Sequence, residues 1–251
     1  MSDLFLSYRT RHAAEVQPLL AALADAGVDV WRDEARIDAG SSITDSVRNG
    51  LASSRAILVW CSPDYMESVV CRWELRTAWI AAESAGPPTD RVFLLLPPGR
   101  TDPRTFLPAE ALGPQIDTSW FRWPTEPAGF AALARQLREK LPAGTLAALH
   151  RFDTAVPWPL RKPLSSERFV GRDRELWQMH GLLQAHRHVA VTGVDRVRTT
   201  QVRGLGGIGK TLLVTEYALL FQGAWPGGVY WFDVGTQSPE DLLRTVMTVV
   251  G

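Results

Sequence analysis

The chain has 251 residues, of which 45% are apolar and 22% charged, and its 27 basic side chains balance its 27 acidic ones. This composition is typical of globular proteins, and the zero net charge excludes a surface built to hold polyanions without specificity. The two cysteines, Cys61 and Cys71, exclude a disulfide framework and a cysteine-rich zinc site, and they favour a reducing cytoplasm. The sequence has no long apolar run and no signal-peptide pattern, so we expect neither a membrane span nor export.

Short apolar runs alternate with amphipathic stretches through the first half of the chain. Each run has the length of a buried strand, and each stretch repeats apolar residues three or four positions apart, as helices do. Strands at 4–8, 28–31, 56–60, 92–96 and 115–117 and helices at 16–23, 43–51, 69–85 and 126–140 are expected. Strands and helices in this rhythm form a parallel sheet with helices on both faces, so the fold is predicted to be α/β.

A proline-rich stretch in which the periodicity fades divides the chain into two units. We place a first domain at 1–141, a linker at 142–164 and a second domain at 165–251. In the second domain we expect helices at 173–187, 210–221 and 239–250, and strands at 200–203 and 229–234. At about 150 residues per domain, the length of the chain also favours two units.

Residues 204–211 read Gly-Leu-Gly-Gly-Ile-Gly-Lys-Thr and satisfy the phosphate-loop pattern G-x-x-x-x-G-K-[ST]. The glycines of the loop are Gly204, Gly206, Gly207 and Gly209. They would let backbone N–H groups surround phosphate oxygens, while Lys210 would reach the outer phosphates and Thr211 would offer its hydroxyl to Mg²⁺. The motif predicts a site for ATP or ADP with Mg²⁺; the alternative is a glycine-rich turn that only begins a helix.

The surroundings of this loop resemble the STAND class of signalling ATPases, which contains the NB-ARC-type switches. Residues 169–176, Phe-Val-Gly-Arg-Asp-Arg-Glu-Leu, are similar to the motif that opens the family's nucleotide-binding domain. The resemblance implies that Arg172 lies on the adenine side of the nucleotide and that 165–251 is the N-terminal part of a P-loop α/β domain. Asp233 ends an apolar run like a Walker B strand, although the family places a different strand directly after the P-loop helix. A complete ATPase cycle is therefore not expected.

Three segments of the first domain arrive in the order and spacing of a TIR domain. They are Phe5-Leu-Ser-Tyr-Arg9, the loop 38–42, and Ser62 followed by 68–75, and the aromatic segment 120–123 stands near the expected last strand. The resemblance implies a flavodoxin-like five-stranded parallel sheet. TIR domains include scaffolds that signal by self-association and enzymes that cleave NAD⁺ with a glutamate on the third helix. Glu74 falls at the place of that glutamate.

The position of Glu74 also has a physical argument. Cys71, Glu74 and Ala78 share one helical face, on a helix that follows a parallel strand, and ligands of such sheets gather outside the carboxyl ends of the strands. Ser7 is expected at this edge, and the candidate substrate-binding residues there are Tyr8, Arg9, Trp31, Arg32, Ser62 and Cys71. There a carboxylate could stabilise the oxocarbenium-like ribose that forms when NAD⁺ loses nicotinamide. Trp31 could stack on a ring of NAD⁺, and Arg9 or Arg32 could meet its pyrophosphate.

Each of these residues also has a structural alternative. Glu74 can be a solvated surface charge, Trp31 a core residue, and Cys71 a small packed hydrophobe. The TIR resemblance further implies that Asp38, Gly40 and Ser41 lie on a loop that completes the site of a neighbouring TIR domain, so activity would require self-association.

Together these features predict a cytoplasmic NAD⁺ glycohydrolase that releases nicotinamide and ADP-ribose or a cyclic ADP-ribose. By family resemblance, a nucleotide-dependent oligomerisation switch would control it in bacterial anti-phage immunity. The alternatives are a non-enzymatic TIR scaffold and a free-standing P-loop ATPase with an inert TIR cap.

Overall fold

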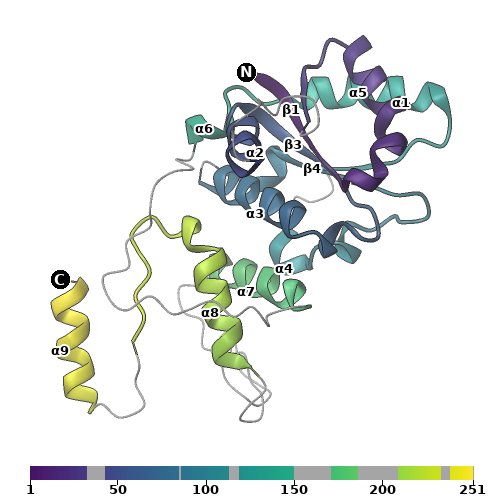
Figure 1. Ribbon diagram of the computed structural model, residues 1–251. Helices are drawn as coiled ribbons and strands as arrows, with labels where there is room; N and C mark the ends of the chain where they lie inside the picture. The colour runs from purple at the N-terminus through teal and green to yellow at the C-terminus, as the bar shows by residue number, and fades with distance from the viewer. Residues whose placement is uncertain are drawn as a thin grey trace. The chain divides into compact units, whose positions relative to one another are not determined.

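The computed structural model describes residues 1–32, 43–84, 86–112, 119–149, 171–185, 209–232 and 238–250. The chain divides into two compact units, Met1–Asp153 and Thr154–Gly251 (Figure 1). Among the described residues, no helix combines the length and the apolar character that crossing a bilayer requires.

The first unit is built on a five-stranded sheet in which each pair of neighbouring strands is parallel, as predicted. The strands are β1 (Ser2–Ser7), β2 (Val30–Trp31), β3 (Ser54–Trp60), β4 (Val92–Leu96) and β5 (Trp120–Arg122), in the order β2-β1-β3-β4-β5. The predicted strand at 92–96 is confirmed to the residue. The predicted last strand at 115–117 lies outside the described residues; the strand that pairs with β4 is the aromatic segment around Phe121.

Helices cover both faces of this sheet (Figure 1). They are α1 (Ala13–Asp25), α2 (Ile43–Ala52), α3 (Val69–Glu83), α4 (Ala109–Leu112), α5 (Pro127–Lys140) and α6 (Leu146–Leu149). Short 3₁₀ turns are η1 (Thr10–His12), η3 (Tyr65–Glu67), η4 (Pro88–Asp90) and η5 (Pro103–Thr105). Helices α1 and α5 pack together on one face, and α2 and α3 lie on the other.

The alternation of side chains along β1 separates the two halves of the core. Leu4 and Leu6 join the apolar cluster that contains Leu19 of α1 and Leu137 of α5. Phe5 points to the opposite face, because successive side chains of a strand alternate. Since Ser7 is two residues beyond Phe5, its hydroxyl also faces the α2–α3 side, at the carboxyl end of the strand.

The first part of the predicted linker is packed on the first unit. The guanidinium of Arg55 donates from Nε to the carbonyl of Pro142 at 2.7 Å, and Nη2 of Arg91 donates to the carbonyl of Ala143 at 2.6 Å. Helix α6 then contacts α2, α3 and β3. Residues 142–149 are therefore held by the sheet layer, and the first unit extends to Asp153.

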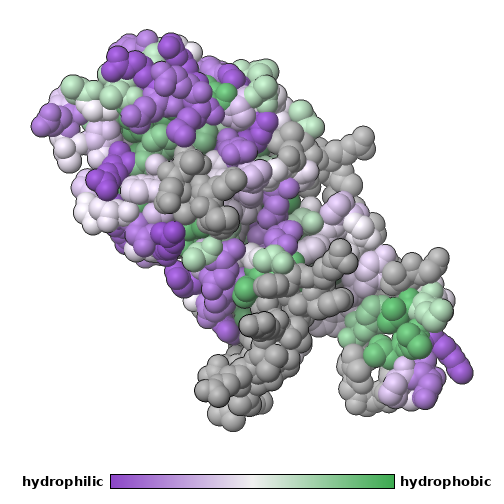
Figure 2. Space-filling model, turned by 180° about the vertical axis from the view of Figure 1, so that it is seen from behind, coloured by the Kyte–Doolittle hydropathy of each residue, from purple (hydrophilic) through white to green (hydrophobic). Residues whose placement is uncertain are grey.

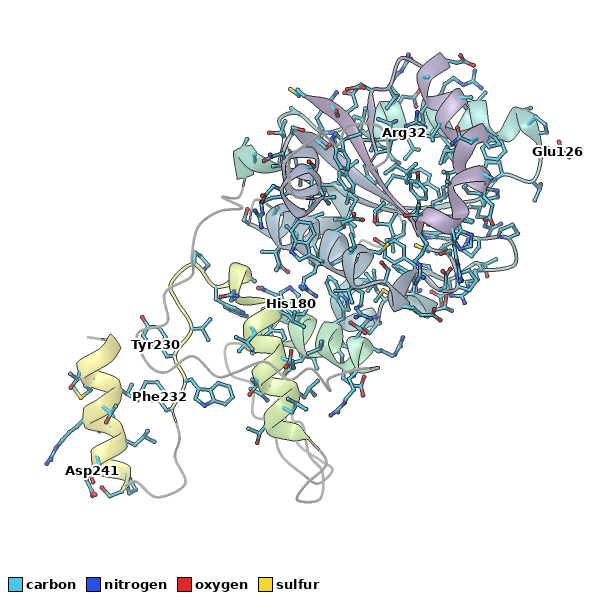
Figure 3. The ribbon with its side chains drawn as sticks, viewed as in Figure 1. Arg32, Glu126, His180, Tyr230, Phe232 and Asp241 are labelled. Carbon is cyan, nitrogen blue, oxygen red and sulfur yellow. The ribbon has the colours of Figure 1, made fainter. Side chains whose placement is uncertain are left out.

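The regular secondary structure in the described part of the second unit is helical. Its helices are α7 (Asp173–Ala185), α8 (Lys210–Leu220), η7 (Gln222–Ala224) and α9 (Pro239–Val250). Nδ1 of His180 on α7, which is labelled in Figure 3, lies 3.0 Å from the hydroxyl of Tyr217 on α8. The ring of Phe221 stacks on that of Tyr217. On α9, Leu243 and Met247 are exposed, and Figure 2 shows apolar side chains gathered over this helix.

The prediction of a strand at 229–234 is wrong for residues 229–232, the part of it that the structure describes. Residues 229–232 have no strand conformation, and Asp233 lies outside the described residues, as does the strand predicted at 200–203. An apolar run forms a strand only where a neighbouring strand satisfies its backbone groups, and the described part of this unit provides no such neighbour. The predicted P-loop α/β domain is therefore not shown, whereas the α/β fold of the first unit is.

Candidate active site

Three elements bring polar side chains together beneath the carboxyl end of β1. The hydroxyl of Ser7 donates to Oε2 of Glu74 on α3 and lies 2.5 Å from the hydroxyl of Tyr65 on η3. The Tyr65 hydroxyl donates to the carbonyl of Cys71 at 3.0 Å. Glu74 is only 5% exposed, so it is not the solvated surface charge that the sequence left open.

Helix α3 places Glu74 on its buried face. Ser68 caps the helix, because its hydroxyl accepts a hydrogen bond from the backbone N–H of Cys71 at 3.2 Å. Cys71, Glu74 and Ala78 are all buried, which confirms the predicted common face. The cap fixes where the helix begins, and the beginning fixes which residues of α3 meet β1.

Glu74 lies on the wall of a cavity of about 370 Å³, within the range of roughly 300–1,000 Å³ that small-molecule sites occupy. The lining residues are Phe5, Leu6, Tyr8, Arg9, Thr10, Arg11, Glu67, Ser68, Val70, Cys71 and Glu74. Tyr8, Arg9, Cys71 and Glu74 are therefore brought together, as the sequence predicts. The cavity joins one buried carboxylate to two guanidinium groups and to the apolar side chain of Val70.

Asp64 organises the cationic side of this cavity. Its carboxylate is 3.3 Å from Nε of Arg9 and 2.7 Å from Nη2 of Arg11, and it accepts a hydrogen bond from Nε2 of His12 at 2.8 Å. Arg9 also donates from Nη1 to the backbone carbonyl of Asp64 at 3.2 Å. One buried carboxylate thus ties the turn after β1 to the turn after β3.

Burial and hydrogen bonding shift the acid–base properties of this region. Burial raises the pKa of Tyr65 well above its usual value, and it raises the pKa of the Cys71 thiol to about 11. Burial would also raise the pKa of Asp64, but hydrogen bonds, led by that from His12, outweigh it and hold the pKa well below its usual range. Desolvation favours the uncharged form of His12, yet the carboxylates of Glu15 and Asp64 raise its pKa. The Cys71 thiol therefore keeps its proton near neutral pH and packs as a small apolar side chain.

Trp31, Arg32 and Ser62 are not among the described residues that line this cavity. Trp31 is 4% exposed and stacks on Phe5, with ring centroids 4.7 Å apart, and its indole ring also lies close against Gly50 of α2. This packing gives Trp31 a core role in place of the predicted stacking on NAD⁺. Arg32 follows the edge strand β2 (Figure 3), and Ser62 is buried at the end of β3.

Several predicted positions lie outside the described residues. They are Asp38, Gly40 and Ser41 in the first unit, and Gly204, Gly206 and Gly207 in the second. Within the described part of the phosphate loop, Gly209 has a φ of +74° and α8 begins directly after it, at Lys210. Thr211 is exposed on the first turn of α8, and Arg172 is 3.3 Å from Glu175. Among the described residues, no three His, Cys, Asp or Glu side chains gather as a metal site.

Sequence reasoning placed Ser7 at this edge without a specific role, and it did not single out Asp64 or Tyr65. The alternation along β1 is a signal for Ser7, since it places this residue on the same face as Phe5. The sequence carries no comparable signal for Tyr65 or Asp64, because they lie on an irregular turn whose path depends on its contacts with β1, η1 and α3.

Comparison with known proteins identifies a family for the first unit. The TIR domain family model matches residues 4–134. Among solved structures, the TIR domain of the Toll-related receptor TRR-2 from Hydra magnipapillata is 15% identical, with 55% of this chain and 99% of that chain covered and a TM-score of 0.39. The TIR domains of the activated Roq1 resistosome, which recognises the effector XopQ, are 21% identical, with 59% and 83% covered and a TM-score of 0.37. No curated protein matches the chain.

Proposed function

The chain belongs to the TIR domain family, and on that premise we propose that its first unit cleaves the nicotinamide–ribose bond of NAD⁺ with Glu74 as the catalytic carboxylate. The observation that carries this proposal is a buried glutamate on the wall of a cavity that also holds two arginines. Many TIR domains are NAD⁺ hydrolases, so the family and the cavity point to the same chemistry.

Cleavage of this bond needs little acid catalysis from the protein. When the bond between C1′ of the ribose and the nicotinamide nitrogen breaks, both electrons go to the nitrogen, so nicotinamide leaves as a neutral molecule. The positive charge passes to the ribose, and the carboxylate of Glu74 would stabilise it there. A water that attacks C1′ then loses a proton and gives ADP-ribose, whereas attack by an adenine nitrogen gives the cyclic product.

Arg9 would bind the pyrophosphate of NAD⁺. A guanidinium carries five N–H donors, and the contacts of Arg9 with Asp64 and Glu67 use Nε and Nη1. Asp64 thereby fixes the direction of the guanidinium and leaves it donors for phosphate oxygens. Tyr8 and Val70 line the same cavity and offer contact area for the rings of the dinucleotide.

The decisive experiment replaces Glu74 by Gln, which keeps the size of the side chain and removes its charge. We expect NAD⁺ loss to fall at least a hundredfold under conditions in which the full chain self-associates, while Glu139→Gln on the exposed surface of α5 leaves it unchanged. Equal NAD⁺ loss in the Glu74→Gln variant and the wild type would refute the enzymatic proposal.

A TIR scaffold that signals by self-association is the second candidate. Val69 and Val70, at the start of α3, are 71% and 48% exposed, which is apolar surface that an assembly would cover. Unchanged self-association with no NAD⁺ loss in the wild type would favour this candidate. In either case TIR–TIR contacts form part of the function, and the loop with Asp38, Gly40 and Ser41 would complete a neighbouring site.

For the second unit, we propose that the loop 204–211 binds ATP or ADP with Mg²⁺ and switches oligomerisation, in a role in bacterial anti-phage immunity. This proposal rests on the sequence motif, since the family match ends at residue 134. The described residues fit it, because Gly209 adopts a left-handed conformation before a helix that begins at Lys210. Lys210 would hold the outer phosphates and Thr211 would offer its hydroxyl to Mg²⁺, which would neutralise phosphate charge. Binding of radiolabelled ADP that survives the Lys210→Ala substitution would refute it.

A further inference from the structure

Three buried oxygen atoms from separate elements form a chain that ends at the proposed catalytic carboxylate. The hydroxyl of Tyr65 comes from η3, the hydroxyl of Ser7 from β1 and Oε2 of Glu74 from α3. Their residues are 0%, 1% and 5% exposed, so bulk water does not compete for these contacts. At its other end the chain reaches the carbonyl of Cys71, 3.0 Å from the Tyr65 hydroxyl.

This row of hydrogen-bonded oxygens has three contacts but only two hydroxyl protons when Glu74 is ionised. Ser7 and Tyr65 each contribute one proton, and a carboxylate or a carbonyl contributes none. If Ser7 donates to Glu74 and Tyr65 donates to Cys71, no proton remains for the contact of 2.5 Å between the two hydroxyl oxygens. The contacts are therefore not all satisfied at once in the ionised state.

Two arrangements give a proton to both contacts of Ser7, and they differ by one proton. In the first, Glu74 is protonated and donates to Ser7, Ser7 donates to Tyr65, and Tyr65 donates to the Cys71 carbonyl. In the second, Glu74 is ionised, Tyr65 donates to Ser7, and Ser7 donates to Glu74. Ionisation of Glu74 thus reverses both hydroxyl groups and releases the Cys71 carbonyl from Tyr65.

The Cys71 carbonyl can be released because it has a second partner. It lies in α3, where the backbone N–H of Leu75, four residues on, is the regular helical donor to it. Tyr65 can therefore turn towards Ser7 without leaving a buried acceptor empty. The gain on turning is a hydrogen bond that strengthens the one from Ser7 to the carboxylate.

The titratable and charged groups around Glu74 come from several elements. Tyr8, Arg9 and Arg11 follow β1, Glu67 lies on η3, and Cys71 lies on α3. His12 and Asp64 lie behind the two arginines. Because burial raises the pKa of Tyr65 far above neutrality and that of Cys71 to about 11, neither loses its proton near neutral pH. His12 is the neighbouring group that an experiment must separate from Glu74.

The geometry points to Tyr65 and Ser7 as positioning residues that hold Glu74 ionised and oriented towards the ribose, through a relay in which each hydroxyl donates in the direction of the carboxylate. This inference rests on the proposed NAD⁺ cleavage. It assigns Tyr65 a role through Ser7, without contact to the substrate.

The test is the pH dependence of NAD⁺ cleavage by the full chain with Tyr65→Phe, which removes one oxygen and keeps the ring. We expect the acid limb of kcat to move up by about one pH unit, because the ionised form of Glu74 loses support. At pH values below the acid limb, kcat of the variant should therefore be roughly tenfold lower than that of the wild type. On the plateau it should stay within about threefold, and KM should be unchanged. Ser7→Ala should move the limb further in the same direction.

Two control variants separate the relay from other causes. Tyr230→Phe removes a hydroxyl that donates to the carbonyl of Gly227 in the second unit, and it should leave the limb in place. His12→Asn removes the neighbouring titration, and it should also leave the limb in place. A Tyr65→Phe protein that melts earlier but keeps the wild-type limb would show a purely structural role and would overturn the relay.

A readout without NAD⁺ distinguishes failure of the relay from failure of the proposed function. The carboxyl carbon of Glu74, labelled with ¹³C and identified by its loss in Glu74→Gln, can be titrated by NMR in the wild type and in Tyr65→Phe. A midpoint about one pH unit higher in Tyr65→Phe supports the relay even if no NAD⁺ is cleaved. Equal midpoints overturn it even if Glu74 is catalytic.

Discussion

Nε2 of His12 lies 2.8 Å from Oδ1 of Asp64, although 52 residues separate them in the chain. The other ring nitrogen of His12, Nδ1, is 2.9 Å from the carboxylate of Glu15. One imidazole therefore joins η1 to the turn after β3 and to the first turn of α1, and its charge decides how strongly it does so.

This contact predicts how stability depends on pH. The pKa of His12 is raised in the folded protein, so its contribution is complete below the unfolded pKa of about 6.5 and is lost as the pH rises through the folded value. The pKa of Asp64 is lowered, so its contribution is present above the unfolded pKa of about 3.9 and is lost on acidification. We expect the His12–Asp64 pair to stabilise the first unit most between these two unfolded pKa values, at about pH 3.9 to 6.5.

The measurement is urea unfolding of the wild type and of His12→Asn at pH 5 and at pH 8.5. The variant should lose up to about 1 kcal/mol at pH 5, the magnitude of a partly exposed ion pair, and much less at pH 8.5. A deficit that is the same at both pH values would mean that the charge of His12 does not contribute.

Gly50 of α2 is expected to tolerate no side chain. Alanine normally stabilises a helix interior by about 1 kcal/mol relative to glycine. At position 50, however, a Cβ would overlap the indole ring of Trp31, which is itself held by Phe5. We predict that Gly50→Ala destabilises the first unit by about 2 kcal/mol, as overpacking does.

A double-mutant cycle with Trp31→Leu checks the cause of this loss. Trp31→Leu removes the ring that the new methyl group meets, so Gly50→Ala should cost much less in its presence. Additive losses in the cycle would show that the two residues do not interact. The same Trp31→Leu variant should lower the melting temperature without a specific rise in the KM for NAD⁺.

Arg9 is predicted to contribute to substrate binding and not to the chemical step. Arg9→Gln keeps a polar side chain, although a shorter one, and removes the charge that would meet the pyrophosphate. We expect KM for NAD⁺ to rise about tenfold or more with kcat within about threefold, in steady-state kinetics. The control is Arg104→Gln, since Arg104 pairs with Asp102 beside η5 and is not among the residues that line the cavity. A fall in kcat at constant KM would contradict this assignment.

The segment 142–149 should detach when its anchors are removed. Arg55 donates to the carbonyls of Leu141 and Pro142, and Arg91 donates to those of Ala143 and Gly144. In the double variant Arg55→Ala with Arg91→Ala, we expect limited proteolysis to cut within 142–149 at least tenfold faster than in the wild type. Cleavage at the wild-type rate would mean that α6 alone holds the segment.

The sequence alone determined the α/β class, the parallel sheet and the buried face of α3. Apolar runs such as 92–96 are fully buried strands, and the three-residue and seven-residue spacing of Cys71, Glu74 and Ala78 is a local property of a helix. The family motifs also lie within short segments. For these reasons the cavity residues Tyr8, Arg9, Cys71 and Glu74 were predictable one by one.

Only the tertiary structure decided which partners these residues have. Trp31 became a core residue and not a ligand platform because Gly50, 19 positions away, leaves room for its ring. Tyr65 and Asp64 gained their roles from contacts across 58 and 52 residues, which no local pattern encodes. The run at 229–232 has no strand conformation because hydrogen bonds between strands depend on a neighbour. The periodicity of apolar residues in the sequence indicates which residues are buried. The hydrogen-bond and acid–base properties of a buried residue depend on partners that are distant in the chain.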